Sequence, residues 1–154
     1  MRRSRVLIVA PAAVIATTAL ATASPAAPTT TDLYASLSGS QEVPTKGNPA
    51  ATGKAEITIS STKGLCYSIT LKKLSGTPQA AHIHRGKKGK AGPVYVALFA
   101  KPKTPKYGKI SGCASATKAK QSAIKAKPGD FYVNVHTKKY PDGELRGQLS
   151  AKKS

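Results

Sequence analysis

Ala81-His82-Ile83-His84-Arg85-Gly86 and, further along the chain, Asn134-Val135-His136-Thr137 are the two segments on which the fold and the candidate site depend. Together they contain every histidine of the 154-residue chain. In both segments apolar and polar residues alternate with period two, which is typical of a half-buried strand. The apolar residues of each segment therefore face one side of the predicted strand, and the histidines face the other.

The same alternation recurs along most of the chain, at residues 33–38, 56–59, 65–72, 94–99 and 131–136. Tyr140-Pro141-Asp142-Gly143 is a tight-turn signal that predicts a hairpin between residues 131–136 and 144–149. Short strands at intervals of about 8 to 12 residues, without a long helical period, predict an antiparallel β-sandwich or barrel in one domain.

Two stretches stand out from this regular pattern. Residues 94–99 are apolar on both faces, which predicts a central strand. Residues 101–127 carry eight lysines and no acidic residue. This stretch is too long for an ordinary hairpin connection, and we expect a loop that contains short strands or helical turns.

The N-terminus reads as an export signal. Arg2, Arg3 and Arg5 precede the apolar run 6–20, and a small-x-small pattern ends at Ala23. This order predicts a signal peptide at 1–23, cleaved on export, and therefore a secreted, extracellular protein. The run is short and broken by Pro11, so we expect no transmembrane segment in the mature chain.

The remaining boundaries follow from composition. Residues 24–31 are rich in Pro, Ala and Thr and predict a disordered linker. The domain is expected at 32–150, and residues 151–154 form a basic tail.

The charge is strongly positive. Removal of the signal arginines lowers the formal net charge from +19 to +16, and only Arg85 and Arg146 then accompany the lysines. Lysine suits diffuse attraction, whereas phosphate and base recognition more often uses the planar arginine fork. We therefore expect anionic cell-envelope or extracellular polymers, or an extracellular protein, as partners, and no specific nucleic acid.

Cys66 and Cys113 are the only cysteines. An even pair in an exported chain predicts one disulfide, because neither cysteine has metal-ligand spacing around it. The parity of residues 65–72 turns Cys66 away from the core, so we expect the bond to hold a loop across the outer face of the sheet.

The histidines form the one candidate site. If the His82 and His84 strand neighbours the 131–149 hairpin, these imidazoles converge with His136 and form three ligands of a zinc or copper ion. A polar cluster is expected on the same face, formed by Asn134, Glu144, Arg146 and Gln148. The alternative is that the histidines only hydrogen-bond the strands together, because Arg146 in the cluster would repel a cation.

Several motifs resemble the CHRD domain, which is named after the repeats in chordin. They are Leu37-Ser38-Gly39-Ser40-Gln41-Glu42-Val43-Pro44, the AHIHRG segment with Gly89 and Gly92-Pro93, YVNVHT, and Gly143-Glu144-Leu145-Arg146-Gly147-Gln148-Leu149. The resemblance spans residues 33–150. It implies an extracellular β-sandwich or immunoglobulin-like Greek-key barrel, and the family carries no settled biochemical activity.

The His-x-His pair and the later Val135-His136 also resemble fragments of copper-zinc superoxide dismutase. That enzyme needs four histidines at copper and further ligands at zinc. Three histidines exist here, so the sequence excludes a complete dinuclear site. Asp142 and Glu144 fit a turn former and a partner for Arg146 better than an acid–base pair, and no established catalytic motif is present.

Two functions are therefore expected from the sequence. The first is a secreted, non-catalytic binding or structural module with a strongly basic surface and no cofactor. The second is a mononuclear copper- or zinc-binding protein that uses His82, His84 and His136 and has at most weak redox activity.

Overall fold

The computed structural model describes residues 27–104 and 107–151. The predicted signal peptide, 1–23, lies outside the described residues, as do 24–26 of the predicted linker and 152–154 of the predicted tail. Strand β1 begins at Thr30, two residues before the expected start of the domain, because Thr30 and Thr31 pair with Ser60 and Ile59. No helix of the described ranges is long and apolar enough to cross a membrane.

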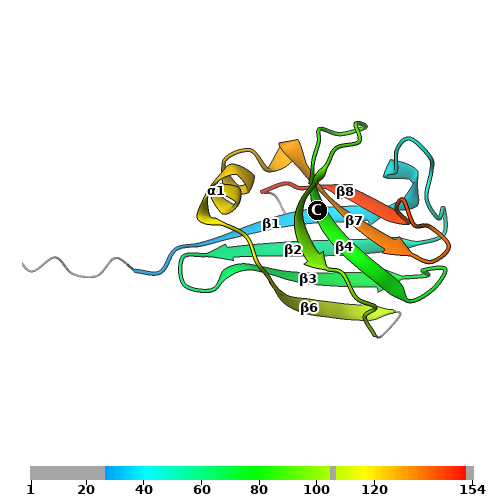
Figure 1. The fold of residues 1–154 in the computed structure, drawn as a ribbon, viewed down its shortest axis with the longest axis horizontal. Coiled ribbons are helices and arrows are strands. Elements are labelled where there is room, and N and C mark those ends of the chain that lie inside the picture. Colours follow the sequence, from blue (N-terminus) through cyan, green and yellow to red (C-terminus); the bar gives the residue numbers. More distant parts are fainter. Residues whose placement is uncertain (1–26, 105–106, 152–154) are drawn as a thin grey trace, which may run out of the picture.

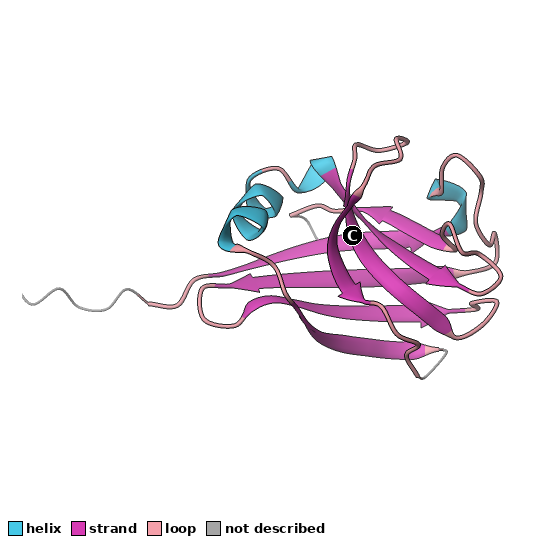
Figure 2. Ribbon diagram, viewed as in Figure 1, coloured by secondary structure: helices cyan, strands magenta, loops and turns pink. Residues whose placement is uncertain are grey.

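The described chain is built almost entirely of strands (Figures 1 and 2). In chain order the elements are β1 (Thr30–Ser38), η1 (Gly39–Gln41), β2 (Thr52–Ser60), β3 (Gly64–Lys72), β4 (Pro78–Arg85), β5 (Val94–Phe99), β6 (Gly108–Ala114), α1 (Lys118–Ala126), η2 (Pro128–Asp130), β7 (Phe131–Thr137) and β8 (Leu145–Gln148).

All eight strands belong to one antiparallel sheet of order β5-β4-β7-β8-β1-β2-β3-β6. The sheet curls until its two end strands, β5 and β6, contact each other, so the domain is nearly a barrel (Figure 1). The predicted all-β, antiparallel, single-domain fold is therefore confirmed. The finer description as an immunoglobulin-like Greek-key sandwich stays a prediction.

The inside of the curled sheet is the hydrophobic core. Period-two alternation places the apolar side chains there, as the sequence predicts. The buried residues that follow the predicted parity are Leu33, Ala35, Leu37, Ile57, Ile59, Leu65, Tyr67, Ile69, Leu71, Ala81, Ile83, Val133, Val135, Leu145 and Leu149.

The prediction of a central strand at residues 94–99 is wrong. Strand β5 is an end strand of the sheet, and Val94 at its start is 52% exposed. Its apolar character has another cause. Register shifts in the β4–β5 pairing let Leu98 and Phe99, which are neighbours in sequence, both become buried.

The lysine-rich segment 101–127 is more regular than expected. It contains β6, which pairs with β3, and α1, whose first turn is capped by Thr117 through a 3.3 Å bond from the Lys120 N–H. The helix buries Ile124 in the core and exposes Lys118 and Lys125, whereas Lys120 is half-buried and its Nζ donates to the Tyr95 carbonyl. Figure 1 shows α1 at one end of the sheet, away from the β3–β4 turn.

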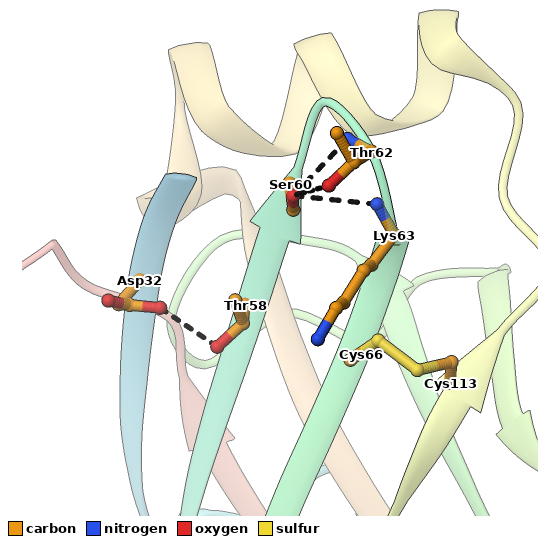
Figure 3. The surroundings of a disulfide bond; sticks show 7 residues. All are labelled: Asp32, Thr58, Ser60, Thr62, Lys63, Cys66 and Cys113. Atoms are coloured by element: carbon orange, nitrogen blue, oxygen red, sulfur yellow. Dashed lines mark hydrogen bonds between the residues drawn. A yellow bond between two sulfur atoms is a disulfide. The ribbon is translucent and has the colours of Figure 1, made fainter. Parts of the chain in front are cut away.

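The predicted disulfide between Cys66 and Cys113 is present (Figure 3). Cys66 is only partly buried between the buried Leu65 and Tyr67, as its parity predicts. Its partner lies in β6 directly opposite it, so the bond joins two neighbouring strands. The expectation that it holds a loop across the sheet is therefore corrected.

Removal of this disulfide should destabilise the domain. The cysteines are 47 residues apart, and loop closure over that distance contributes about 4 kcal/mol in the chain-entropy model. We expect Cys66→Ser/Cys113→Ser to lower the free energy of unfolding by up to that amount, measured by denaturant titration. Ser68→Ala/Ser111→Ala changes another directly opposed pair on the same strands and should cost less than about 0.5 kcal/mol. Equal stability of the cysteine variant and the parent would contradict the prediction.

Candidate functional site

The three histidines converge on the outer face of the sheet because β4 pairs directly with β7. His82 lies opposite Asn134, and His136 lies one diagonal step away, opposite Ala80. The ring centroid of His82 is 4.9 Å from that of His136 and 5.6 Å from that of His84. One nitrogen from each of the three rings lies within 4.8 Å of the other two, a geometry in which they could share a metal ion.

Backbone carbonyls orient two of the imidazoles. His84 Nδ1 lies 2.9 Å from the Gly92 carbonyl oxygen, and His136 Nδ1 lies 2.8 Å from that of Pro141. A carbonyl oxygen can only accept a hydrogen bond, so Nδ1 of each ring carries the proton. The lone pair of each neutral ring is therefore on Nε2.

The remaining nitrogens face one another. His82 Nδ1 lies 3.1 Å from His136 Nε2, and with the His136 proton on Nδ1 the His82 N–H must donate. His84 Nε2 is buried and has no hydrogen-bond partner in the described chain. A buried nitrogen lone pair without a partner is uncommon in folded proteins and indicates a missing ligand or water.

The surroundings keep all three rings neutral. Burial, together with the charges that His136 and His84 would carry, lowers the pKa of His82 to about 4. Burial also lowers the pKa of His84 and of His136, although the hydrogen bonds to Gly92 and Pro141 act in the opposite direction. A neutral imidazole is the form that binds a metal ion.

Arg146 is separated from the histidines by an aromatic ring. Strand β7 lies between β4 and β8, so its Tyr132 has His84 on one side and Arg146 on the other. The His84 ring stacks on Tyr132 with centroids 4.9 Å apart and planes 9° apart. The Arg146 guanidinium carbon lies 3.4 Å from the Tyr132 centroid. The Tyr132 ring thus lies between the guanidinium and the imidazoles, but after burial the Arg146 charge is one of the causes that lower the pKa of His84, so it still acts against a cation there.

The four residues of the predicted polar cluster share one face but contact different loops. Arg146 Nη2 donates to the carbonyls of Lys87 and Lys90 at 3.1 and 2.8 Å. Gln148 Nε2 donates to the carbonyls of Gly86 and Gly129, both at 2.8 Å. Each side chain therefore holds loop backbone against the outer face of the sheet.

Glu144 does not pair with Arg146 as expected. Its carboxylate is fully buried and accepts hydrogen bonds from the side chains of Asn48 and Thr137 and from the backbone N–H and hydroxyl of Ser75. Burial opposes ionisation, but these bonds outweigh it and lower the pKa of the carboxyl. Glu144 is a structural tie between loops.

The sequence analysis assigned no role to Glu42, which the structure buries beside Asn134. Asn134 Nδ2 lies 3.5 Å from Glu42 Oε2, while Glu42 Oε1 and Asn134 Oδ1 have no hydrogen-bond partner in the described chain. Burial raises the pKa of Glu42 to about 7, although the Arg146 charge acts to lower it. The only sequence signal for this residue is its place in the 37–44 motif.

Gly92 is a second residue whose role the sequence analysis did not assign. A Cβ at this position would lie 1.8 Å from the Arg85 carbonyl oxygen, which is closer than atoms can approach. The close approach brings the Gly92 carbonyl to His84 and its N–H to 3.2 Å from the Tyr132 hydroxyl. A glycine is therefore required for the loop to orient the histidine.

Glu42 should give the domain a characteristic pH profile. A carboxyl whose pKa is raised from 4.5 to about 7 binds a proton in the folded state that the unfolded chain has already lost. The contribution of Glu42 to stability therefore falls as pH rises from about 4.5 through 7, by on the order of 2 kcal/mol. The histidines act in the opposite direction, because their lowered pKa values make stability rise with pH in this range. We expect the stability of Glu42→Gln to rise more steeply with pH than that of the parent when unfolding is measured between pH 4 and 8. Glu56→Gln, which removes a carboxylate from β2, is the matched control, and a profile of Glu42→Gln that coincides with the parent's would refute the assignment.

Comparison with known proteins places the chain in a family. The model of the CHRD domain matches residues 33–149. This range contains the histidine cluster, the disulfide and all eight strands, except for the first three residues of β1. Searches of the curated proteins and of the solved structures returned no significant match. The match covers most of the chain and agrees with the resemblance seen in its motifs, and we conclude that the chain belongs to the CHRD domain family.

Proposed function

We propose that this protein is an exported CHRD module that binds one transition-metal ion, copper or zinc, through His82, His84 and His136. The observation that carries the proposal is His84 Nε2, a buried nitrogen with no hydrogen-bond partner in the described chain that faces two further imidazoles. A metal ion would satisfy this nitrogen without any movement of the strands.

The donor set fits these metals. Three imidazole nitrogens are the protein ligands of one common type of catalytic zinc site, and imidazole also suits copper. Three ligands leave a coordination position for water or a small ligand. The set holds too few histidines for the dinuclear centre of superoxide dismutase, and we assign no reaction to the site beyond weak redox activity if the ion is copper.

The hydrogen bonds made by the opposite nitrogens of the imidazole rings support the same proposal. Metal-bound histidines almost always donate their other ring N–H to a carbonyl or carboxylate, which fixes the tautomer. The Gly92 and Pro141 carbonyls do this for His84 and His136. His136 Nε2 accepts from His82 Nδ1, whereas His84 Nε2 ties no strands together, because it has no hydrogen-bond partner among the described residues.

Export is part of the proposal and has independent support. The Cys66–Cys113 disulfide is typical of proteins outside the reducing cytosol. CHRD domains are typically extracellular, which agrees with the signal-peptide pattern at 1–23.

The metal site can be tested by direct binding. We expect the purified 24–154 chain to take up one equivalent of Cu(II) or Zn(II), measured by elemental analysis after removal of free metal, and to melt at a higher temperature when metal is added. Loss of one ligand should weaken metal binding by more than about 100-fold, which exceeds the usual effect of changing a residue that only hydrogen-bonds to a ligand. The variants are His82→Ala and His136→Ala.

Lys138→Ala is the matched control, because this exposed residue follows His136 closely but carries no ligand atom that suits the site. It should bind like the parent. A parent protein that retains no stoichiometric metal, and whose melting temperature is unchanged by copper and by zinc, would rule out the proposal.

A second candidate function is a non-catalytic module that binds anionic cell-envelope or extracellular polymers. The observation in its favour is the net charge of +19, or +16 without the signal arginines. It is compatible with a metal site, since the two would use different residues.

A further inference from the structure

We propose that Arg146 is the centre of an oxyanion-binding pocket, separate from the histidine cluster, that takes a phosphate, sulfate or carboxylate group. The pocket has a volume of about 220 Å³ and lies between the loop that follows β1 and the loop that joins β4 to β5. Its charged lining residues are Lys46, Lys88 and Arg146, and no acidic side chain lines it. The space exceeds that of one water, roughly 30 Å³, several-fold.

The guanidinium has hydrogen-bond donors to spare. Arg146 is only 2% exposed, yet both of its hydrogen bonds leave from Nη2 and end on the carbonyls of Lys87 and Lys90. Of the five N–H donors of an arginine, those on Nε and Nη1 therefore have no acceptor among the described residues. These donors are not among the buried atoms that have no hydrogen-bond partner, and Arg146 lines the pocket, so the free donors are open to it and can donate to an oxyanion there.

The contacts of the Arg146 guanidinium with the loop carbonyls and with Tyr132 hold it in a fixed orientation. The guanidinium stacks on Tyr132 at 3.4 Å, and the two carbonyls hold one of its edges. Its free edge presents parallel N–H groups, the arrangement that pairs with two oxygens of a carboxylate or phosphate. Little conformational freedom would be lost on binding, because the donor is already in place.

Two lysines add charge at the rim. Lys46 Nζ is held by the carbonyls of Ser40 and Glu42 at 2.8 and 3.3 Å, and Lys88 lies across the pocket on the β4–β5 loop. The nearest acidic group to the guanidinium, Glu42, does not line the pocket. Because burial favours its neutral form, it leaves the positive charge of Arg146 incompletely compensated.

A basic protein attracts polyanions through exposed lysines at any part of its surface, so charge alone does not establish a site. What separates the proposed pocket from such attraction is an arginine held in one orientation by two carbonyls and Tyr132, with its remaining donors open to the pocket. The expected behaviour is therefore saturable, one-to-one binding of a small oxyanion that changes with these particular residues and not with lysines elsewhere.

The test is calorimetric titration of the metal-free, chelator-treated protein with inorganic phosphate, sulfate and acetate at constant ionic strength set by chloride. We expect one site per chain, weakened about tenfold in Lys46→Gln/Lys88→Gln. The control Lys118→Gln/Lys125→Gln removes the same charge from α1 and should retain the parent affinity. Arg146→Lys keeps the positive charge but loses the planar pair of N–H donors. It should bind the oxyanions at least tenfold more weakly, while a thermal melt confirms that the variant is folded.

Chelator treatment removes any metal ion from the histidines, so oxyanion binding at the pocket is measured separately from metal binding. Either proposal can therefore be refuted without the other. A second experiment compares the binding of dextran sulfate with that of uncharged dextran. It shows whether the pocket binds the oxyanion as a free ion or as a substituent of a polymer. Absence of saturable binding to all three ions, or equal weakening in the two lysine pairs, would overturn the proposal.

Discussion

One constraint shapes most of this domain: the outer face of β4, β7 and β8 carries polar side chains, yet loops cover it. A buried polar group must find a hydrogen-bond partner or lose stability. On β8, Arg146 Nη2 and Gln148 Nε2 donate to loop carbonyls, and just before that strand Glu144 accepts from Asn48, Ser75 and Thr137. The loops are therefore held by the same side chains that they bury.

The histidine cluster is a consequence of this arrangement. The carbonyls of Gly92 and Pro141 belong to loops that the outer face positions, and they decide which nitrogen of His84 and His136 carries the proton. His136 Nε2 then accepts from the His82 N–H, whereas His84 Nε2 is the imidazole nitrogen of the described residues that is buried without a hydrogen-bond partner. A metal ion would provide that partner.

Tyr132 divides the outer face into two regions of opposite chemistry. Neutral imidazoles lie on one side of its ring, and the Arg146 guanidinium lies on the other. The two regions lie on neighbouring strands, and the Arg146 charge contributes, after burial, to the lowered pKa of His84. The apolar core on the inner face is independent of both, because it is formed by the opposite parity of the same strands.

Residue patterns were enough to predict the strands, their inward and outward faces and the outward position of the histidines, because the pleat of a strand sets these locally, and the cysteine pair predicted the disulfide. They also led to three errors: the central place of β5, the pairing of Glu144 with Arg146, and a loop held across the sheet by the disulfide. That the polar face is buried, that Glu42 lies within it, and that carbonyls orient the imidazoles became visible only in the folded domain. These features depend on how loops far apart in sequence pack on one another. Every residue carries a backbone carbonyl, so the sequence does not show which carbonyl accepts a hydrogen bond from a histidine. The outward parity of His82 and His84 could be read from AHIHRG, whereas their partners could not.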